Sequence, residues 1–252
     1  MAILTSSWKH FKYEGVAQLR SISTLFFTLL MPVIFFLAMR GLGGDDETMK
    51  DFAVPATSIM AIVFGTTMNL AISMVYLREY GMLLRYRLTP LSNLDAVLPK
   101  LLVAALISTL SVAVLVVLDW VAFSNPPSFP AILAYLGVII IMTFAYGTIG
   151  VALSLVMPNE NSASPIMSVL LIPLLMISGV FMPADFMDLP GWLDAIAGIL
   201  PFRSSQQLLE SIYLADPIVD WPFSAIMILA IWLAVALLSL KFGNLTSPRN
   251  RR

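Results

Sequence analysis

Long runs of apolar residues dominate this sequence and limit the folds that it can adopt. Each of six runs approaches the ~20 residues that an α-helix needs to cross a bilayer. Charged residues make up only 12% of the chain, whereas soluble domains carry about 25%. The sequence therefore predicts an all-α polytopic membrane protein, one transmembrane domain over residues 1–252, and disfavours a soluble helical domain. The six predicted transmembrane spans are residues 21–39, 52–76, 98–123, 131–156, 165–182 and 223–241.

The segment before the first apolar run, residues 1–20, is polar with a narrow apolar stripe. Trp8, Phe11 and Leu19 fall near one face of a helix, while charged and amide side chains occupy much of the rest. This pattern is typical of an amphipathic helix that lies in the membrane interface. A plain polar lead-in to the first span is the alternative, and the stripe favours the interfacial helix.

Basic residues are distributed unevenly between the two ends of the predicted spans. If the N-terminus lies inside, eleven of the 14 Lys and Arg residues fall on the inner side, and only Arg40, Lys50 and Arg203 fall outside. Loops rich in Lys and Arg remain in the cytoplasm. We therefore expect a multi-pass protein of the cell membrane, inner or plasma, with both termini in the cytoplasm.

The fifth run leads into a second apolar element that is too short to cross the membrane again. Residues 183–203 form this amphipathic element, which the orientation above places at the outer face, and residues 204–222 are polar and acidic. We expect short outer helices between the fifth and sixth spans, with Trp192 as an interfacial anchor. Phe186 and Trp192 are candidates for an outer gate, and a static helix packed on the bundle is an equally good interpretation.

Several classes of active site lack the residues that they require. The chain has one histidine, His10, and no cysteine, which argues against a Ser–His protease and a Cys/His metal site. No two carboxylates lie deep in the spans, and Asp119 is expected at the membrane interface, so a proton-coupled transporter is disfavoured. No G-x-x-x-x-G-K-[ST] motif is present. We expect that the chain itself binds no nucleotide, metal or other cofactor, and no nucleic acid.

The inner loop between the second and third spans combines charged and apolar residues. Thr89-Pro90 ends its predicted helix, and Ser92 or Asn93 can cap the next one. A short amphipathic helix of this kind suits docking of a cytoplasmic partner. A helix that faces anionic lipid headgroups is the alternative, and these residues barely separate the two. The candidate docking residues are Arg78, Glu79, Tyr80, Met82, Leu83, Arg85, Arg87 and Leu88.

The second and fifth spans carry scattered polar and methionine side chains. Such side chains commonly join helices through hydrogen bonds, and they can also line a path for an amphiphilic molecule. Helix packing is the better-supported interpretation of the polar residues taken alone. The candidates for a translocation path are Phe64, Met68, Asn69, Ser168, Met176 and Ser178.

Three motifs resemble the permeases of type-2 ABC exporters, the group that includes the daunorubicin/doxorubicin exporter permease. Their order and the layout of six spans after an interfacial helix agree along nearly the whole chain. The motifs are Arg78-Glu79 with Gly81, Leu88-Thr89-Pro90-Leu91-Ser92 and Lys100; Asn159 and Asn161 with Pro173, Ser178-Gly179-Val180-Phe181 and Pro183; and Leu189-Pro190 with Trp192 and Pro201-Phe202.

The resemblance implies a membrane-spanning permease subunit of an ATP-driven ABC exporter, and not an enzyme. It would move hydrophobic or amphiphilic compounds, drugs or lipids, outward through the cell membrane, as in multidrug export and antibiotic resistance. Export of lipid-linked glycans is the alternative, and a non-ABC membrane protein or enzyme is a weaker one.

The resemblance also implies partners. Two permeases, either two copies or two related chains, would form a dimer among membrane lipids. Each would sit on an ATP-binding cassette ATPase subunit, which would bind ATP and Mg²⁺. The sequence shows no fused ATPase domain, so we expect a separate partner chain. Residues 79–89 would form the coupling helix, and the second and fifth spans would line the path.

Overall fold

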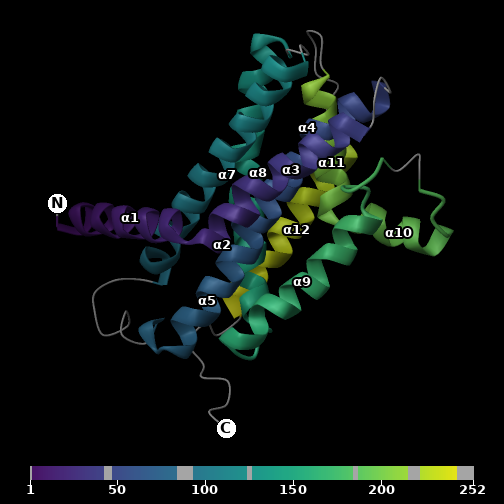
Figure 1. Ribbon diagram of the computed structural model, residues 1–252. Coiled ribbons are helices and arrows are strands. Elements are labelled where there is room, and N and C mark those ends of the chain that lie inside the picture. The colour runs from purple at the N-terminus through teal and green to yellow at the C-terminus, as the bar shows by residue number, and fades with distance from the viewer. Residues whose placement is uncertain are drawn as a thin grey trace.

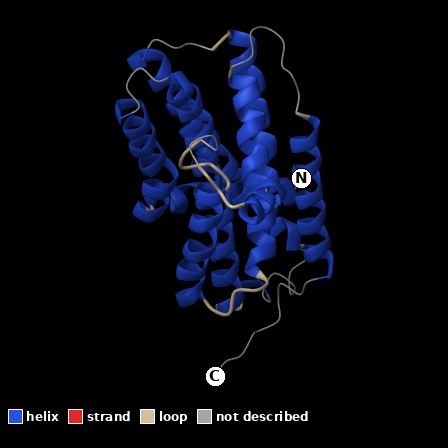
Figure 2. Cartoon of the chain, turned by 90° about the vertical axis from the view of Figure 1, so that its right-hand side faces the viewer, coloured by secondary structure: helices blue, strands red, loops and turns tan. Residues whose placement is uncertain are grey.

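The computed structural model describes residues 2–42, 47–83, 93–123, 127–183, 187–214 and 222–242. Throughout these ranges the chain forms helices joined by short loops and contains no strand, as Figures 1 and 2 show. Helices satisfy their own backbone hydrogen bonds, which a bilayer requires. The elements are α1 (Ala2–Arg20), α2 (Ile22–Leu25), η1 (Phe26–Leu30), α3 (Met31–Leu42), α4 (Glu47–Ile62), η2 (Val63–Met68), α5 (Asn69–Glu79), α7 (Asn93–Phe123), α8 (Phe129–Ser154), α9 (Glu160–Ile177), α10 (Gly191–Ile199), α11 (Pro201–Tyr213) and α12 (Phe223–Phe242).

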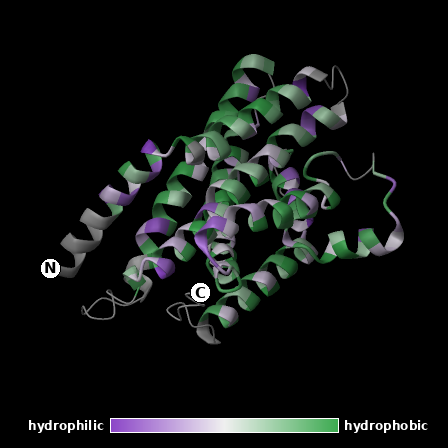
Figure 3. Ribbon diagram, turned by 60° about the horizontal axis from the view of Figure 1, so that its bottom comes forward, coloured by the Kyte–Doolittle hydropathy of each residue, from purple (hydrophilic) through white to green (hydrophobic). Residues whose placement is uncertain are grey.

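Each predicted span coincides largely with helical chain. Five helical stretches are long and apolar enough to cross a membrane, and they correspond to the second to sixth predicted spans. The first predicted span corresponds to α2, η1 and α3, in which the apolar part, Phe26–Gly41, is shorter. Figure 3 shows mainly hydrophobic residues along the bundle and hydrophilic residues on α1 and near helix ends. The structure confirms an all-α polytopic membrane protein, and the number of six crossings stays a prediction.

The N-terminal segment forms the expected helix. α1 projects sideways from the bundle in Figure 1 and packs beside α7. An ion pair joins the two helices, with 2.6 Å between Lys100 Nζ and Glu14 Oε2. The location of α1 in the membrane interface stays a prediction.

The continuous helix formed by α4, η2 and α5 is the centre of the bundle. In its most apolar stretch 83% of the residues are buried, compared with 11% for α12 at the periphery. Lipid can cover an apolar helix such as α12, but the central helix carries hydroxyl side chains, among them Thr66 and Thr67, that need protein neighbours. The helices α3, α7, α8 and α11 pack against it. The second predicted span therefore positions the other helices.

A glycine allows α8 to approach this central helix closely. A Cβ atom placed on Gly150 would lie 2.4 Å from the backbone oxygen of Thr67, well inside van der Waals contact. The Thr67 hydroxyl donates to the carbonyl of Tyr146, with 3.1 Å between the oxygens. Small residues at membrane helix interfaces permit this kind of backbone approach.

Pro32 interrupts the hydrogen bonding of the first predicted span, and α7 compensates for it. Proline has no N–H, so the carbonyl of Thr28, four residues earlier, loses its usual helical donor. The Ser111 hydroxyl donates to this carbonyl at 2.7 Å. The π-helical turn η1 lies at the same place, where a break in the helical ladder is accommodated.

The segment between α9 and α12 differs from the prediction in one respect. Short helices are present there as predicted, but residues 204–213 are not a polar outer loop. They belong to α11, which packs against α4, α8 and α12 and has most of its residues buried. The Ser205 and Tyr146 hydroxyls lie 2.8 Å apart, and the rings of Phe202 and Tyr146 stack. Burial of Ser205 is possible because α8 supplies a hydroxyl partner for it.

Asp119 is buried in the protein, which the sequence did not indicate, and its location at the depth of the membrane interface stays a prediction. Its side chain forms an ion pair with Arg40 of α3, whose Nε donates to Oδ1 at 2.8 Å. The Tyr213 hydroxyl of α11 donates to the other carboxylate oxygen at 2.6 Å. A buried charge requires such partners. The contact joins α3, α7 and α11 at one end of the bundle.

Two alanine variants test the close contact of α8 with the central helix. Gly150→Ala is expected to destabilise the protein by about 1–3 kcal/mol, because its methyl group collides with backbone that cannot move aside. Gly137→Ala in the same helix, with nothing within 4 Å of its Cβ, is expected to be neutral or to stabilise by up to ~1 kcal/mol. Thermal unfolding followed by tryptophan fluorescence measures both. Equal melting temperatures for the two variants would contradict the contact.

A double-mutant cycle tests the compensation of Pro32. Ser111→Ala is expected to destabilise the protein by about 1–2 kcal/mol, because the Thr28 carbonyl is left without a donor. In a Pro32→Ala background the carbonyl regains an N–H within its own helix, so the same substitution should cost clearly less. Unfolding in mixed micelles of increasing denaturing detergent gives the four free energies. An identical loss in both backgrounds would exclude this role for Ser111.

Candidate functional site

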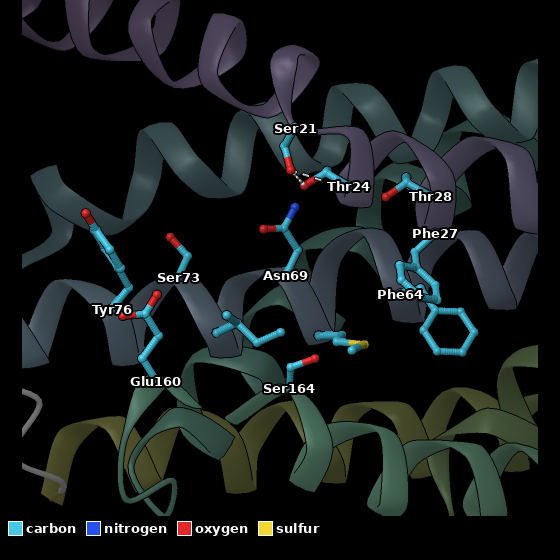
Figure 4. Close-up of a pocket in the computed structure, with 12 residues that line it drawn as sticks. Ser21, Thr24, Phe27, Thr28, Phe64, Asn69, Ser73, Tyr76, Glu160 and Ser164 are labelled. Carbon is cyan, nitrogen blue, oxygen red and sulfur yellow. Dashed lines mark hydrogen bonds between the residues drawn. The ribbon is translucent and has the colours of Figure 1, made fainter. Parts of the chain in front are cut away.

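A cavity of about 300 Å³ lies between three segments that are distant in sequence. Figure 4 shows side chains from α2–η1 on one side, from η2–α5 in the centre and from α9 on the other side. The cavity is open rather than enclosed, as a site for exchange of a ligand must be. Its lining residues are Ser21, Thr24, Phe27, Thr28, Phe64, Met68, Asn69, Ile72, Ser73, Tyr76, Glu160 and Ser164.

One end of the cavity is mainly apolar. The rings of Phe27 and Phe64 lie with their centroids 6.1 Å apart, and Met68 follows one turn later on the central helix. Thr28 also lines this end, and no described residue forms a hydrogen bond with its buried hydroxyl. Burial of an unpaired hydroxyl costs about 1–3 kcal/mol. This end of the cavity therefore suits an apolar ligand that brings one hydrogen-bonding group.

The other end is polar and acidic. Asn69 and Ser73 extend from α5 toward the cavity, and Tyr76 lies one turn farther along, near Glu160 of α9 (Figure 4). Polarity thus increases along the cavity from Phe64 to Glu160. A surface of this kind can hold the apolar and polar parts of an amphiphilic molecule at the same time.

Asn69 also connects the cavity to α1 and α7. Its amide nitrogen lies 3.5 Å from Oε1 of Gln18, at the limit of a hydrogen bond. Gln18 donates to Oε1 of Glu14 at 3.3 Å, and the other oxygen of Glu14 pairs with Lys100. A row of polar contacts therefore leads from the cavity wall to the beginning of α7.

Arg78 and Glu79, the last residues of α5, hold the turn between α8 and α9. The Arg78 guanidinium donates to the carbonyl of Ser154 at 2.9 Å and also to the carbonyl of Met157. Glu79 Oε2 accepts a hydrogen bond from the backbone N–H of Glu160 at 2.6 Å. These contacts satisfy groups that helix ends leave free, and the carboxylate is favourable at a helix N-terminus. We call them the α5 clasp.

Two tyrosines lie beside the clasp. The rings of Tyr76 and Tyr80 are tilted against each other with centroids 4.5 Å apart. The negative charge of Glu160 raises the pKa of the Tyr80 hydroxyl above its ordinary value. Aromatic faces and a carboxylate therefore occupy the same end of the cavity.

Three of the six predicted path residues line the cavity, namely Phe64, Met68 and Asn69. The other three lie on α9 or at its end without lining it: Ser168 is partly buried, Met176 is 54% exposed, and Ser178 is the buried C-cap. The residues of α9 that line the cavity are instead Glu160 and Ser164, which both precede the fifth predicted span. The transport role of all these residues stays a prediction.

The first predicted span contributes residues that the sequence prediction missed. Ser21, Thr24 and Thr28 line the cavity and are spaced by three and four residues, which places them on one helical face. This spacing was available in the sequence as a polar stripe within an apolar run. What the sequence could not indicate is that the stripe faces the second span.

The predicted docking residues have different environments. Arg78 and Glu79 form the clasp, Tyr80 is exposed, and Leu83 is buried in a small apolar cluster that Met82 partly joins. Arg85, Arg87 and Leu88 lie outside the described residues, as does the gate candidate Phe186. The other gate candidate, Trp192 of α10, is 66% exposed. Docking and gating by these residues stay predictions.

Comparison with known proteins places the cavity and the clasp within a family. The chain is 24% identical over 196 residues to the "Probable multidrug ABC transporter permease YbhR" of Escherichia coli (strain K12), over 75% of this chain and 52% of that protein. It is 21% identical over 202 residues to the "Putative transport permease ycf38" of Cyanophora paradoxa, over 80% of this chain and 68% of that protein.

The chain spans about half the length of the bacterial relative. No solved structure matches it, and the narrower resemblance to the daunorubicin exporter group stays a prediction. The sequence model described as "ABC-2 type transporter" matches residues 2–214, which include every residue of the cavity and of the α5 clasp. The chain therefore belongs to the ABC-2 type transporter family.

Proposed function

We propose that this chain is the membrane-spanning permease subunit of an ATP-driven exporter that moves hydrophobic or amphiphilic compounds, drugs or lipids, outward. The observation that carries the proposal is the open cavity with an apolar end at Phe64 and an acidic end at Glu160, in a chain of the ABC-2 type transporter family. An amphiphile requires both kinds of surface. The match to a protein named as a multidrug permease supports drugs as substrates.

The orientation that we propose places both termini and the α5 clasp on the cytoplasmic side of the inner or plasma membrane. The asymmetry of Lys and Arg residues supports this choice. A partner ATPase subunit, which binds ATP and Mg²⁺, then docks on the loop that follows the clasp. The predicted docking residues Arg85, Arg87 and Leu88 belong to that loop.

The clasp supplies a physical route from such a partner to the cavity. Arg78 and Glu79 end α5 and also bind the turn before α9, so movement of the loop after α5 acts on the first turn of α9. Glu160 and Ser164 of α9 form one wall of the cavity. Only 22% of the most apolar stretch of α9 is buried. A helix with so little buried surface can shift without disrupting the core.

We further propose that a second permease, either another copy or a related chain, completes the path. The cavity is open at one side, and α9 exposes large apolar residues such as Val169 and Met176. In this arrangement α10, with its exposed Trp192, covers the outer end of the path. Where the second permease does not cover the apolar surface of α9 and α10, membrane lipids do.

A bulky residue in the cavity tests its role in transport. Ser164→Trp fills much of the cavity and is expected to lower substrate-stimulated ATP hydrolysis and export roughly tenfold or more, equivalent to at least ~1.4 kcal/mol of lost binding. Met227→Trp, on the exposed surface of α12, is the matched control and should transport as the unmodified protein does. Dye export from vesicles that contain the permease and its ATPase measures the effect.

Two results would contradict the proposal. Unchanged export by an assembled Ser164→Trp complex would show that the cavity is not on the path. Failure of every amphiphile tested to stimulate ATP hydrolysis by the complex would count against an exporter altogether.

Substitution of Glu79 tests the clasp. In Glu79→Ala the backbone N–H of Glu160 loses its acceptor, so the first turn of α9 should exchange amide hydrogens about fivefold faster, the equivalent of one net hydrogen bond of ~1 kcal/mol. Glu79→Gln retains an acceptor oxygen and should give an intermediate value. Hydrogen exchange with mass spectrometry follows this turn, and the middle of α8 is the internal control. Exchange unchanged in α9 would contradict the coupling of α5 to α9.

A further inference from the structure

At the acidic end of the cavity, no ion pair between described residues balances the carboxylates. Glu160 lines the cavity, and Glu79 touches its backbone N–H. Among the described residues neither carboxylate takes part in an ion pair; the three pairs present there involve other acids. Arg78 lies next in the chain, but its guanidinium donates to the carbonyls of Ser154 and Met157. Carboxylates placed in this way attract cations and repel anions.

Aromatic rings lie at the same end. Tyr76 lines the cavity, and the ring of Tyr80 is 4.5 Å from it, centroid to centroid. The face of an aromatic ring attracts an ammonium group, and the attraction strengthens where water is partly excluded. A carboxylate beside two tyrosines is thus a suitable environment for an organic ammonium group.

At the opposite end of the cavity, the buried hydroxyl of Thr28 forms no hydrogen bond with any described residue. The Thr28 side chain is only 1% exposed. Two contacts fix the position of Thr28. The Ser111 hydroxyl donates to its backbone carbonyl, and its side chain packs so closely on Gly65 that a Cβ atom there would overlap it. This buried hydroxyl is independent of the acidic end, and it indicates a ligand that carries a hydrogen-bond acceptor.

The central helix sets the distance between the two ends. Phe64, beside Thr28, and Tyr76, beside Glu160, lie on one continuous helix. At 1.5 Å per residue this separation is about 18 Å. Between them the wall is formed by Met68, Asn69 and Ile72, which are largely apolar. A ligand that contacts both ends is therefore elongated.

We propose that the cavity binds elongated organic cations, with an ammonium group between Glu160 and Tyr76, an apolar body along Met68 and Ile72, and an acceptor that receives the hydrogen bond of Thr28. The inference rests on the proposed function and narrows its substrates from amphiphiles in general to cationic ones. The same carboxylates disfavour fatty acids and anionic lipids.

N-Dansyl-1,10-diaminodecane is a suitable probe, because it has a terminal ammonium group, a fluorescent aromatic group with sulfonyl acceptors, and a ten-carbon chain that separates the two by nearly the length of the cavity. Its N-acetyl derivative has the same body without the charge. Binding of each probe to the purified full chain in phosphatidylcholine nanodiscs is followed by dansyl fluorescence. We expect the charged probe to bind about tenfold more tightly than the acetylated one, because its ammonium group gains both the ion contact with Glu160 and the contact with the ring of Tyr76.

Four variants separate the two ends of the site. Glu160→Gln should remove the preference for the charged probe, and Glu160→Asp should retain most of it and guards against misfolding of the first variant. Thr28→Val, nearly equal in shape, should weaken both probes about fivefold, because both carry the sulfonyl acceptor. Asp188→Asn, an exposed acid outside the cavity, removes the same charge and should change nothing.

The outcomes decide between the charge assignment and the function. Equal binding of both probes, binding of neither, or a preference that survives Glu160→Gln would overturn the cation site. Loss of preference in Asp188→Asn would also overturn it, because the effect would then reflect net charge. The experiment requires no ATPase. If the cation site is wrong, the chain can still export neutral amphiphiles. If the chain is not an exporter, the preference for the charged probe can still be measured.

Discussion

In the hydrocarbon of a bilayer no water is available to bind a free backbone group, so each interruption of a helix needs a partner from its own protein. This constraint explains the contact between Ser111 and the carbonyl that Pro32 leaves free. Buried hydroxyl groups need partners for the same reason, and around the central helix they pair with one another. Thr66 and Ser108 lie 3.1 Å apart, and Tyr135 donates to Ser58 at 2.9 Å. Thr66 and Thr67 of the second predicted span therefore join helices, as the helix-packing interpretation expected, whereas Asn69 and Ser73 line the cavity.

The same irregularities shape the cavity. The two π-helical segments, η1 and η2, lie side by side, and both supply residues to its apolar end. A π-helical turn widens the helix and changes the direction in which the following side chains point, and such turns are frequent at functional sites. In η2 the glycine at 65 lets the two segments approach until its missing Cβ would overlap Thr28. The cavity therefore begins where two helices are both irregular and closely packed.

The sequence allowed the helices to be predicted well and the cavity only in part. Hydrophobic length locates each span because the bilayer imposes it, and Phe64, Met68 and Asn69 were identified from their chemistry. Contacts between spans have no such one-dimensional signal. Asp119 pairs with Arg40, which is 79 residues away in the sequence, and Ser205 contacts Tyr146, which is 59 residues away. Neither the burial of Asp119 nor the packing of α11 against α8 could be predicted without knowledge of these partners.

The two ends of the bundle differ in how strongly they are held. At one end the ion pair of Arg40 and Asp119 is buried and receives a third contact from Tyr213, and loss of one partner from such a pair costs about 3–5 kcal/mol. At the other end the α5 clasp consists of hydrogen bonds near the surface, of which the contact of Glu79 with α9 is exposed and is worth about 1 kcal/mol. Movement is therefore easier at the clasp. Glu160 belongs both to the clasp and to the cavity. Separation of α5 from α9 at the clasp therefore moves the acidic end of the cavity before it moves the apolar end.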